Sequence, residues 1–446
     1  MAPKGNRVNS RRTLKRPAAA KTRARPEPVL PNITEENFCL KTFISDLWRA
    51  LNIRKTDETS WSVLEVATSG SGVWTTIHCL WMMLGKAWVR ELYALEQDAV
   101  AAQFLMTNFA PLHVFQDFEG VQNDRSLWCW KHGCKCTVPE GETLFVGTHN
   151  DRSLQSAVIH VAERKPRIAL LTCVSGRGNQ DPELNKVMER LSASSGPLAA
   201  TKWVVGDASP LPCARQRILF YIAEANMAER LEDMQKRLHE RVQAMPKHCV
   251  SSMLQPLNVT SIPEELSVTE KANFESQYHK AFSKQLAKAI QCAKLPKDVR
   301  LPKTRPSSKF SHALTAWECA QVDVLSLMLE HQISSEGSSG NGRPKLADYS
   351  QSPNRGTFFT RGTCANVSTT SKWFEYDSQT LVSPVSFFKI HGHQMKKLKG
   401  CEVGHTFSEG DIRRLAGNGV TCTMMVCALT PVLLELGYLE HVPPSS

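Results

Sequence analysis

The sequence lacks any run of 18 apolar residues, so no segment is long enough to cross a bilayer as a helix. It also lacks, near its start, the apolar segment that directs secretion. With 41% hydrophobic and 22% charged residues over 446 positions, the composition excludes collagen, a small disulfide scaffold and a wholly disordered chain. We therefore expect a soluble globular protein of two or three packing units.

The cysteines do not indicate disulfides. There are fourteen of them, and in a chain without an export signal thiols usually stay reduced. We expect no structural disulfides.

Most of the net positive charge lies at one end. The formal net charge is +11, and residues 1–26 alone hold nine Lys and Arg and no acid. Residues 1–32 are rich in Pro and Ala without apolar periodicity, which predicts a disordered basic arm. Two basic clusters at 15–17 and 21–25 resemble a bipartite nuclear-localisation signal for a nuclear import receptor. An Arg-rich organellar transit peptide and a plain solvated tail are the alternatives.

Between residues 60 and 224, short apolar strands alternate with helices, which is typical of an α/β domain with a largely parallel sheet. The pattern predicts strands at 62–66, 92–95, 112–115, 167–171, 203–205 and 218–222, and helices ending near Leu84 and Met106 and covering 153–164 and 182–194. Beyond residue 224, apolar residues recur every three or four positions over 227–242 and 274–290, which predicts two amphipathic helices. Residues 334–342, mostly Ser and Gly, indicate a linker.

A glycine-rich turn follows the first of these strands. Gly70 and Gly72 allow a ligand to approach the backbone closely, and Glu96, at the end of the next strand, is placed to accept hydrogen bonds from a ribose. A plain structural turn and a solvated acid are the alternative interpretation.

Further segments, in this order and at these distances, resemble the DNA cytosine-5 methyltransferases over residues 60–224 and 376–435. The glycine turn is similar to the family's S-adenosylmethionine motif, Glu96 to its ribose-binding acid, and Asp117 to the acid at its adenine edge. The other matching segments are Asn108-Phe109, Asn150-Asp151-Arg152, Pro212 to Arg217, Ser383-Pro384 and Leu415 to Val420, in which Asn418 lies. Asp117 and Asn418 have helix capping as their alternative role.

The resemblance implies a Rossmann-like methyltransferase fold that binds S-adenosyl-L-methionine and acts on DNA. It implies a cofactor domain at 33–224, an inserted helix-rich domain resembling a target-recognition domain at 225–375, and a return to the first domain at 376–446. Enzymes of this kind attack cytosine carbon 6 with a Cys thiolate, while a Glu acts as general acid and an Arg holds the flipped base.

At the catalytic positions the sequence departs from the family pattern. Cys136 is the candidate nucleophile, with Cys134 second, and the family's preceding Pro is replaced by Lys135, whose charge is expected to lower the thiol pKa. Arg215 and Arg217 match the family's paired arginines. Thr172 stands where the general-acid Glu is expected, so a catalytically inactive relative that binds DNA or a partner enzyme is the alternative function.

Two further alternatives concern Cys136 and the central basic stretch. Cys129, His132, Cys134 and Cys136 could instead form a zinc site, although Cys-x-Cys is a poor ligand spacing, and an ordinary thiol is also possible. Residues 294–309, rich in Lys and Arg, form either a solvated face or a phosphate-binding surface.

Overall fold

The computed structural model describes residues 38–70, 72–116, 126–149, 151–174, 198–205, 211–213, 217–245, 250–257, 267–292, 295–302, 304–336, 346–355, 358–359, 364, 367–394, 398–400 and 406–443. All of them belong to one compact unit, Ile33–Ser446. Several sequence-based predictions lie outside the described residues: the basic arm with its localisation signal, Asp117, Arg215, Asn150, the helix at 182–194 and most of the predicted linker.

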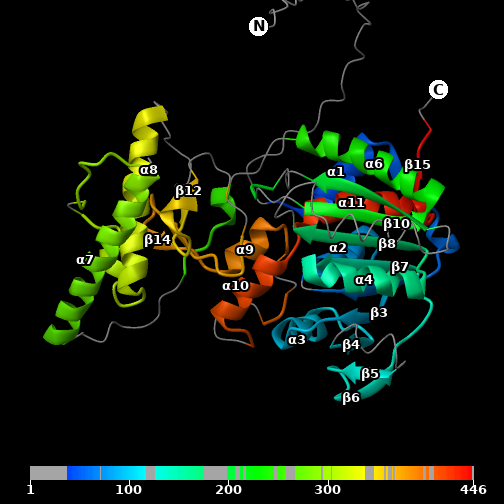
Figure 1. Ribbon diagram of the computed structural model, residues 1–446. Coiled ribbons are helices and arrows are strands. Elements are labelled where there is room, and N and C mark those ends of the chain that lie inside the picture. The colour runs from blue at the N-terminus through cyan, green and yellow to red at the C-terminus, as the bar shows by residue number, and fades with distance from the viewer. Residues whose placement is uncertain are drawn as a thin grey trace, which may run out of the picture. The chain divides into compact units, whose positions relative to one another are not determined.

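Among the described residues, nine strands form one sheet in the order β6-β5-β4-β3-β2-β7-β8-β10-β9 (Figure 1). Its middle is parallel, and antiparallel pairs extend it at both edges. The strands are β2 Leu64–Ser69, β3 Val89–Leu95, β4 His113–Phe115, β5 Ser126–Cys129, β6 Cys134–Thr137, β7 Leu144–His149, β8 Ile168–Val174, β9 Leu198–Val205 and β10 Arg217–Glu224.

The strand order reverses at β2. The chain runs outward from β2 through β3 to β4, and then returns to add β7 on the other side of β2. In open parallel sheets the crevice at such a switch point, beyond the carboxyl ends of the strands, is the usual ligand site. The loop at Gly70 therefore begins at the expected position for a bound ligand.

Apolar helix faces cover this sheet. Helix α4 packs on β7 and β8 through Leu154, Ala157, Val158 and Val161, spaced for one helix face. Helix α11 is buried over almost its whole length and packs against α2 and α6, so it is a central core helix. The helices are α1 Leu40–Ala50, α2 Trp74–Met83, α3 Ala99–Asn108, α4 Asp151–Arg164, α6 Ala225–Gln243, α10 Glu409–Asn418 and α11 Cys422–Glu435.

Residues 267–382 hold a second, smaller core. Helices α7 and α8 pack together with a four-stranded antiparallel sheet of order β12-β11-β13-β14. The buried Tyr278 on α7 donates a 2.7 Å hydrogen bond to Asp323 on α8. The elements are α7 Val268–Gln291, α8 Ala316–Glu336, β11 Leu346–Asp348, β12 Phe358–Phe359, β13 Trp373–Glu375 and β14 Thr380–Leu381. The short helix α9, Val385–Ile390, follows this core and packs on α10.

The two ends of the described chain meet in a separate two-stranded sheet. Strand β1, Ile53–Lys55, pairs with β15, Leu439–His441. Within the described residues, no single helix is long and apolar enough to span a membrane; α10 and α11 reach that composition only as a pair bent by 41°.

The predicted α/β, Rossmann-like fold class is confirmed by this sheet and its helices. The predicted strands appear as β2, β3, β4, β8, β9 and β10, and the two periodic segments after residue 224 form α6 and α7. Helix α6, which the expected boundary places in the inserted domain, packs on β9 and β10. The packing of the main sheet therefore continues past residue 224.

Gly417 and Gly410, both in α10, allow a matched test of how closely α10 packs on the segment at Thr369. A Cβ at Gly417 would lie 2.3 Å from Thr369 N, whereas one at Gly410 would come no closer than 3.7 Å to Ser408 Oγ. We expect Gly417→Ala to destabilise the protein by about 1–3 kcal/mol through overpacking, and Gly410→Ala to change stability by less than about 0.5 kcal/mol. Urea unfolding measures both, and equal effects would contradict the close packing.

Candidate functional site

The loop after β2 is shaped by two glycines with positive φ. Gly70 has φ 82° and Gly72 φ 97°, values that favour glycine over any residue with a side chain. Gly70 N–H donates to the carbonyl of Leu95 (2.9 Å), which holds the start of this loop beside the carboxyl end of β3. Two residues without side chains, the half-buried Gly70 and the buried Gly72, therefore lie at the switch point of the sheet.

The C-terminal part of the chain closes on this loop. A Cβ at Gly72 would lie 2.3 Å from the carbonyl oxygen of Asn418 and 3.0 Å from Gly419 Cα. Asn418 is the last residue of α10, and the N-cap of α11 is Thr421, so Asn418 is not a helix N-cap. The Gly70–Gly72 loop and the Asn418 segment, far apart in sequence, thus lie together in the structure.

Glu96 is a buried acid, and only one of its two carboxylate oxygens has a hydrogen-bond partner among the described residues. The residue is 2% exposed, and its Oε1 accepts a hydrogen bond from Asp98 N (2.9 Å). Its Oε2 is buried and has no hydrogen-bond partner among the described residues. Burial raises the pKa of Glu96 to about 7, because the carboxylate is removed from water. A hydroxyl group brought to Oε2 would satisfy this oxygen and stabilise the charged form.

Two more contacts tie the last helices to this edge of the sheet. Asp98 caps α3 by accepting from Val100 N (2.8 Å), and it pairs with Arg414 of α10 (3.1 Å). Arg217, buried on β10, donates from Nη2 to the carbonyl of Gly419 (3.4 Å). The predicted arginine thus supports the turn after Asn418.

Cys136 lies elsewhere. It is on β6, the outermost strand, four strand steps from β2, which is about 19 Å at the usual spacing. Arg217 lies seven steps from the same strand, roughly 33 Å. The structure therefore does not bring Cys136 and Arg217 together.

The surroundings of Cys136 also differ from the expectation. Its Sγ is 3.3 Å from His132 Nδ1 and 3.9 Å from Cys134 Sγ. Burial, followed by interactions with the thiols of Cys134 and Cys129, raises the pKa of Cys136 to about 11. Lys135 was expected to lower this pKa, so that expectation is wrong.

Thr172 and Asn108 both contact other parts of the protein. Thr172 is fully buried within β8, between Thr148 of β7 and Leu219 of β10. The side-chain amide of Asn108 brackets the backbone of Lys399, accepting from its N–H (2.6 Å) and donating to its carbonyl (3.3 Å). Thr172 supplies no carboxylate to act as general acid, and Asn108 ties α3 to a later loop.

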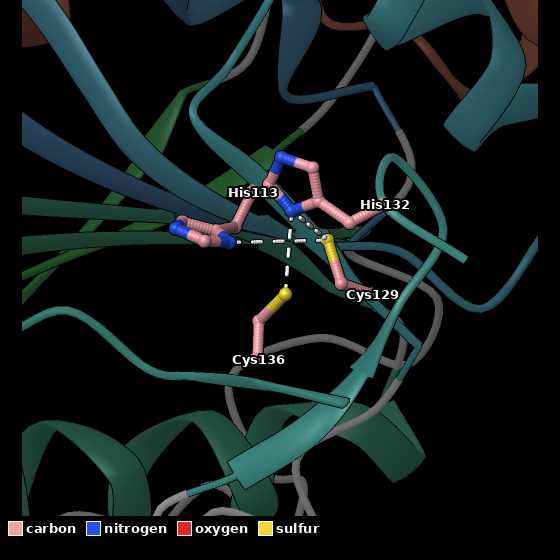
Figure 2. A group of neighbouring side chains, drawn as sticks. All are labelled: His113, Cys129, His132 and Cys136. Atoms are coloured by element: carbon pink, nitrogen blue, oxygen red, sulfur yellow. Dashed lines mark hydrogen bonds between the residues drawn. The ribbon is translucent and has the colours of Figure 1, made fainter. Parts of the chain in front are cut away.

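The structure brings together two groups of residues that could hold a metal ion, and the sequence predicted neither group with this membership. His113 joins Cys129, His132 and Cys136 in one group (Figure 2), and buried His78, His393 and Cys422 form another; within each, all ligand atoms lie within 4.8 Å of one another. The sequence had grouped Cys134 with the first set, because spacing alone does not show that β4 brings His113 beside the hairpin. No sequence pattern joins the second set, whose members lie on three separate segments.

Comparison with known proteins gives likeness in structure alone. No family model matches the chain, and no curated protein matches it. One similar solved structure is described as a DNA modification methyltransferase of an E. coli prophage: 14% identity, 84% of this chain and 99% of that chain covered, TM-score 0.44. The S. pombe Dnmt2 methyltransferase is 10% identical, with 84% of this chain and 98% of that chain covered and a TM-score of 0.39. The Entamoeba histolytica methyltransferase EhMeth is 10% identical, with 84% of this chain and 99% of that chain covered and a TM-score of 0.41. At such identities the likeness concerns the fold and leaves the activity to be argued from the site.

Proposed function

We propose that this protein is an S-adenosylmethionine-dependent methyltransferase whose cofactor lies against Gly70, Gly72, Glu96 and Asn418. The observation that carries the proposal is the contact of Gly72 with Asn418 on the same edge of the sheet as a buried, half-satisfied acid. A glycine turn at the switch point and an acid at the end of the next strand are parts of a nucleoside-binding site in such sheets, and the Asn418 segment lies against this turn.

Each residue has a distinct task in this proposal. Glu96 accepts hydrogen bonds from the ribose hydroxyls through Oε2, the oxygen that has no partner among the described residues. Gly70 and Gly72 let the ligand approach the backbone, and Asp98 with Arg414 holds the α10 wall in place. The bound cofactor supplies an electrophilic methyl group on sulfur.

As the substrate we propose cytosine in DNA. The sequence motifs support this choice, and the similar structures are named as methyltransferases, one of them a DNA modification enzyme. Within the basic stretch, Lys297, Arg300 and Lys309 are exposed and available to phosphates. Arg305 is not, because it pairs with Glu275 (2.9 Å) and lies over the Tyr278 ring.

A catalytically inactive, cofactor-binding relative that binds DNA or a partner enzyme is the second candidate. It is favoured by the distance between Cys136 and the cofactor edge and by Thr172 at the general-acid position. General acid catalysis contributes about 10²–10⁴-fold, so its loss without a substitute leaves little activity.

The Gly72 contact gives the first test. We expect Gly72→Ala to weaken binding of S-adenosylhomocysteine about tenfold or more, because its Cβ displaces Asn418 or the ligand. Gly85→Ala is the matched control, since Gly85 has φ 104° but its Cβ would come no closer than 3.8 Å to Trp88. Calorimetry gives both affinities, and unchanged binding by Gly72→Ala would remove the proposed site.

The pKa of Glu96 predicts a pH dependence. Ribose hydroxyls donate best to the carboxylate, which protonates as pH falls through about 7. We expect the affinity for S-adenosylhomocysteine to fall below pH 7 by up to about tenfold per unit. Glu96→Gln should bind more weakly at pH 8 and lose this dependence. A wild-type profile that matches that of Glu96→Gln would contradict the role of Glu96.

Transfer of tritiated methyl groups to duplex DNA separates the two candidate functions. The first predicts incorporation at cytosine that Gly72→Ala greatly reduces and Gly85→Ala retains. Cofactor binding without incorporation into DNA would instead support the inactive relative, and incorporation into RNA alone would correct the substrate.

A further inference from the structure

Four side chains from three strands and a turn converge at the β5–β6 end of the sheet. Figure 2 shows His113 of β4, Cys129 of β5, His132 of the turn and Cys136 of β6 pointing toward one centre. Cys129 Sγ lies 3.5 Å from His132 Nδ1 and 3.9 Å from His113 Nδ1, and Cys136 Sγ lies 3.3 Å from His132 Nδ1. Each residue offers one ligand atom to the same small space.

These separations fit a tetrahedral metal ion. Zinc binds sulfur at about 2.3 Å and nitrogen at about 2.0–2.1 Å, so a tetrahedral site places a sulfur and a nitrogen about 3.6 Å apart. The three measured separations, 3.3, 3.5 and 3.9 Å, lie on both sides of that value. A Zn²⁺ ion with two thiolates and two neutral imidazoles forms a complex with no net charge, which suits a partly buried position.

The ladder that joins this hairpin to the rest of the sheet is short. Strands β5 and β6 are four residues each, and β5 pairs with β4 through a single pair, Phe115 with Cys129. A short hairpin is marginally stable by itself. An ion bound to β4, β5, the turn and β6 would fasten all four segments together.

We propose that His113, Cys129, His132 and Cys136 form a structural zinc site. Such a site uses all four positions of the ion, with none left for a reacting molecule. The proposal assigns Cys136 to the metal and therefore removes it as the methyltransferase nucleophile, since a metal-bound thiolate on an edge strand is not available for attack.

Cys134 provides a matched control. It lies two residues from Cys136 on the same strand, is exposed, and falls outside the group of converging ligands. The site therefore predicts opposite results for two neighbouring cysteines.

The test measures metal in the purified full chain by mass spectrometry. We expect one zinc per chain in the wild type and in Cys134→Ser, and loss of most of it in Cys129→Ser, His132→Ala, Cys136→Ser and His113→Ala. Wild-type protein without stoichiometric zinc, or zinc retained by Cys136→Ser, would overturn the proposal. Zinc lost equally by Cys134→Ser would also overturn this ligand set.

Cobalt substitution keeps the proposal testable if the variants fail to fold. We expect Co²⁺ added to the metal-free wild type to give the intense visible absorption of a tetrahedral site together with thiolate-to-cobalt charge transfer. An octahedral spectrum, or one without thiolate bands, would contradict the site. Because neither readout depends on cofactor or DNA, failure of this proposal is distinguishable from failure of the proposed function.

Discussion

The proposed cofactor site depends on a close approach between two backbones, that of Gly72 and that of Asn418. The carbonyl oxygen of Asn418 occupies the space that a side chain at position 72 would need, and the φ of 97° at Gly72 adds a second reason for glycine. Arg414 bound to Asp98 and Arg217 bound to Gly419 hold the same segment from two other directions. The C-terminal segment thus lines the proposed site and is held against the main sheet.

Buried acids elsewhere in this domain show why Glu96 is distinctive. Glu142 is also buried, but both of its oxygens receive hydrogen bonds from Arg164, and Tyr93 donates to one of them. Within the part of the chain that the structure describes, one oxygen of Glu91 has no hydrogen-bond partner, and burial raises the pKa of Glu91 to about 8, yet this acid lies within β3. Glu96 also has an oxygen without a partner among those residues, and it lies at the carboxyl end of the sheet. A buried carboxylate oxygen without a hydrogen bond costs folding free energy. The position of Glu96 at the end of the strand indicates that this acid, rather than Glu91, is the one suited to a ligand.

The sequence predicted what depends on local pattern. Apolar runs located the central strands, and the spacing of apolar residues located α6 and α7, because these signals lie within one element. The hairpin of β5 and β6 was missed, since its strands are short and β6 is mostly exposed. Gly72, Glu96 and Asn418 were grouped through motif order, whereas the burial of Glu96 and the atoms that meet at Gly72 required the fold.

For Cys136, order along the chain and order in the sheet give different neighbours. It precedes β7 in sequence, as a nucleophile of the resembled family would, yet the chain places it on the far side of β3 and β4 from β7. His113 was overlooked for the converse reason, because it is distant in sequence and adjacent through β4. The two sites are nevertheless connected: Trp130, in the turn between Cys129 and His132, donates from its indole nitrogen to the carbonyl of Glu96 (3.1 Å). Its backbone N–H also bonds to Val114 (2.7 Å). A metal that fixes this turn would therefore also fix the backbone of the acid at the proposed cofactor site, and the proposed zinc site gives these cysteines a positioning role.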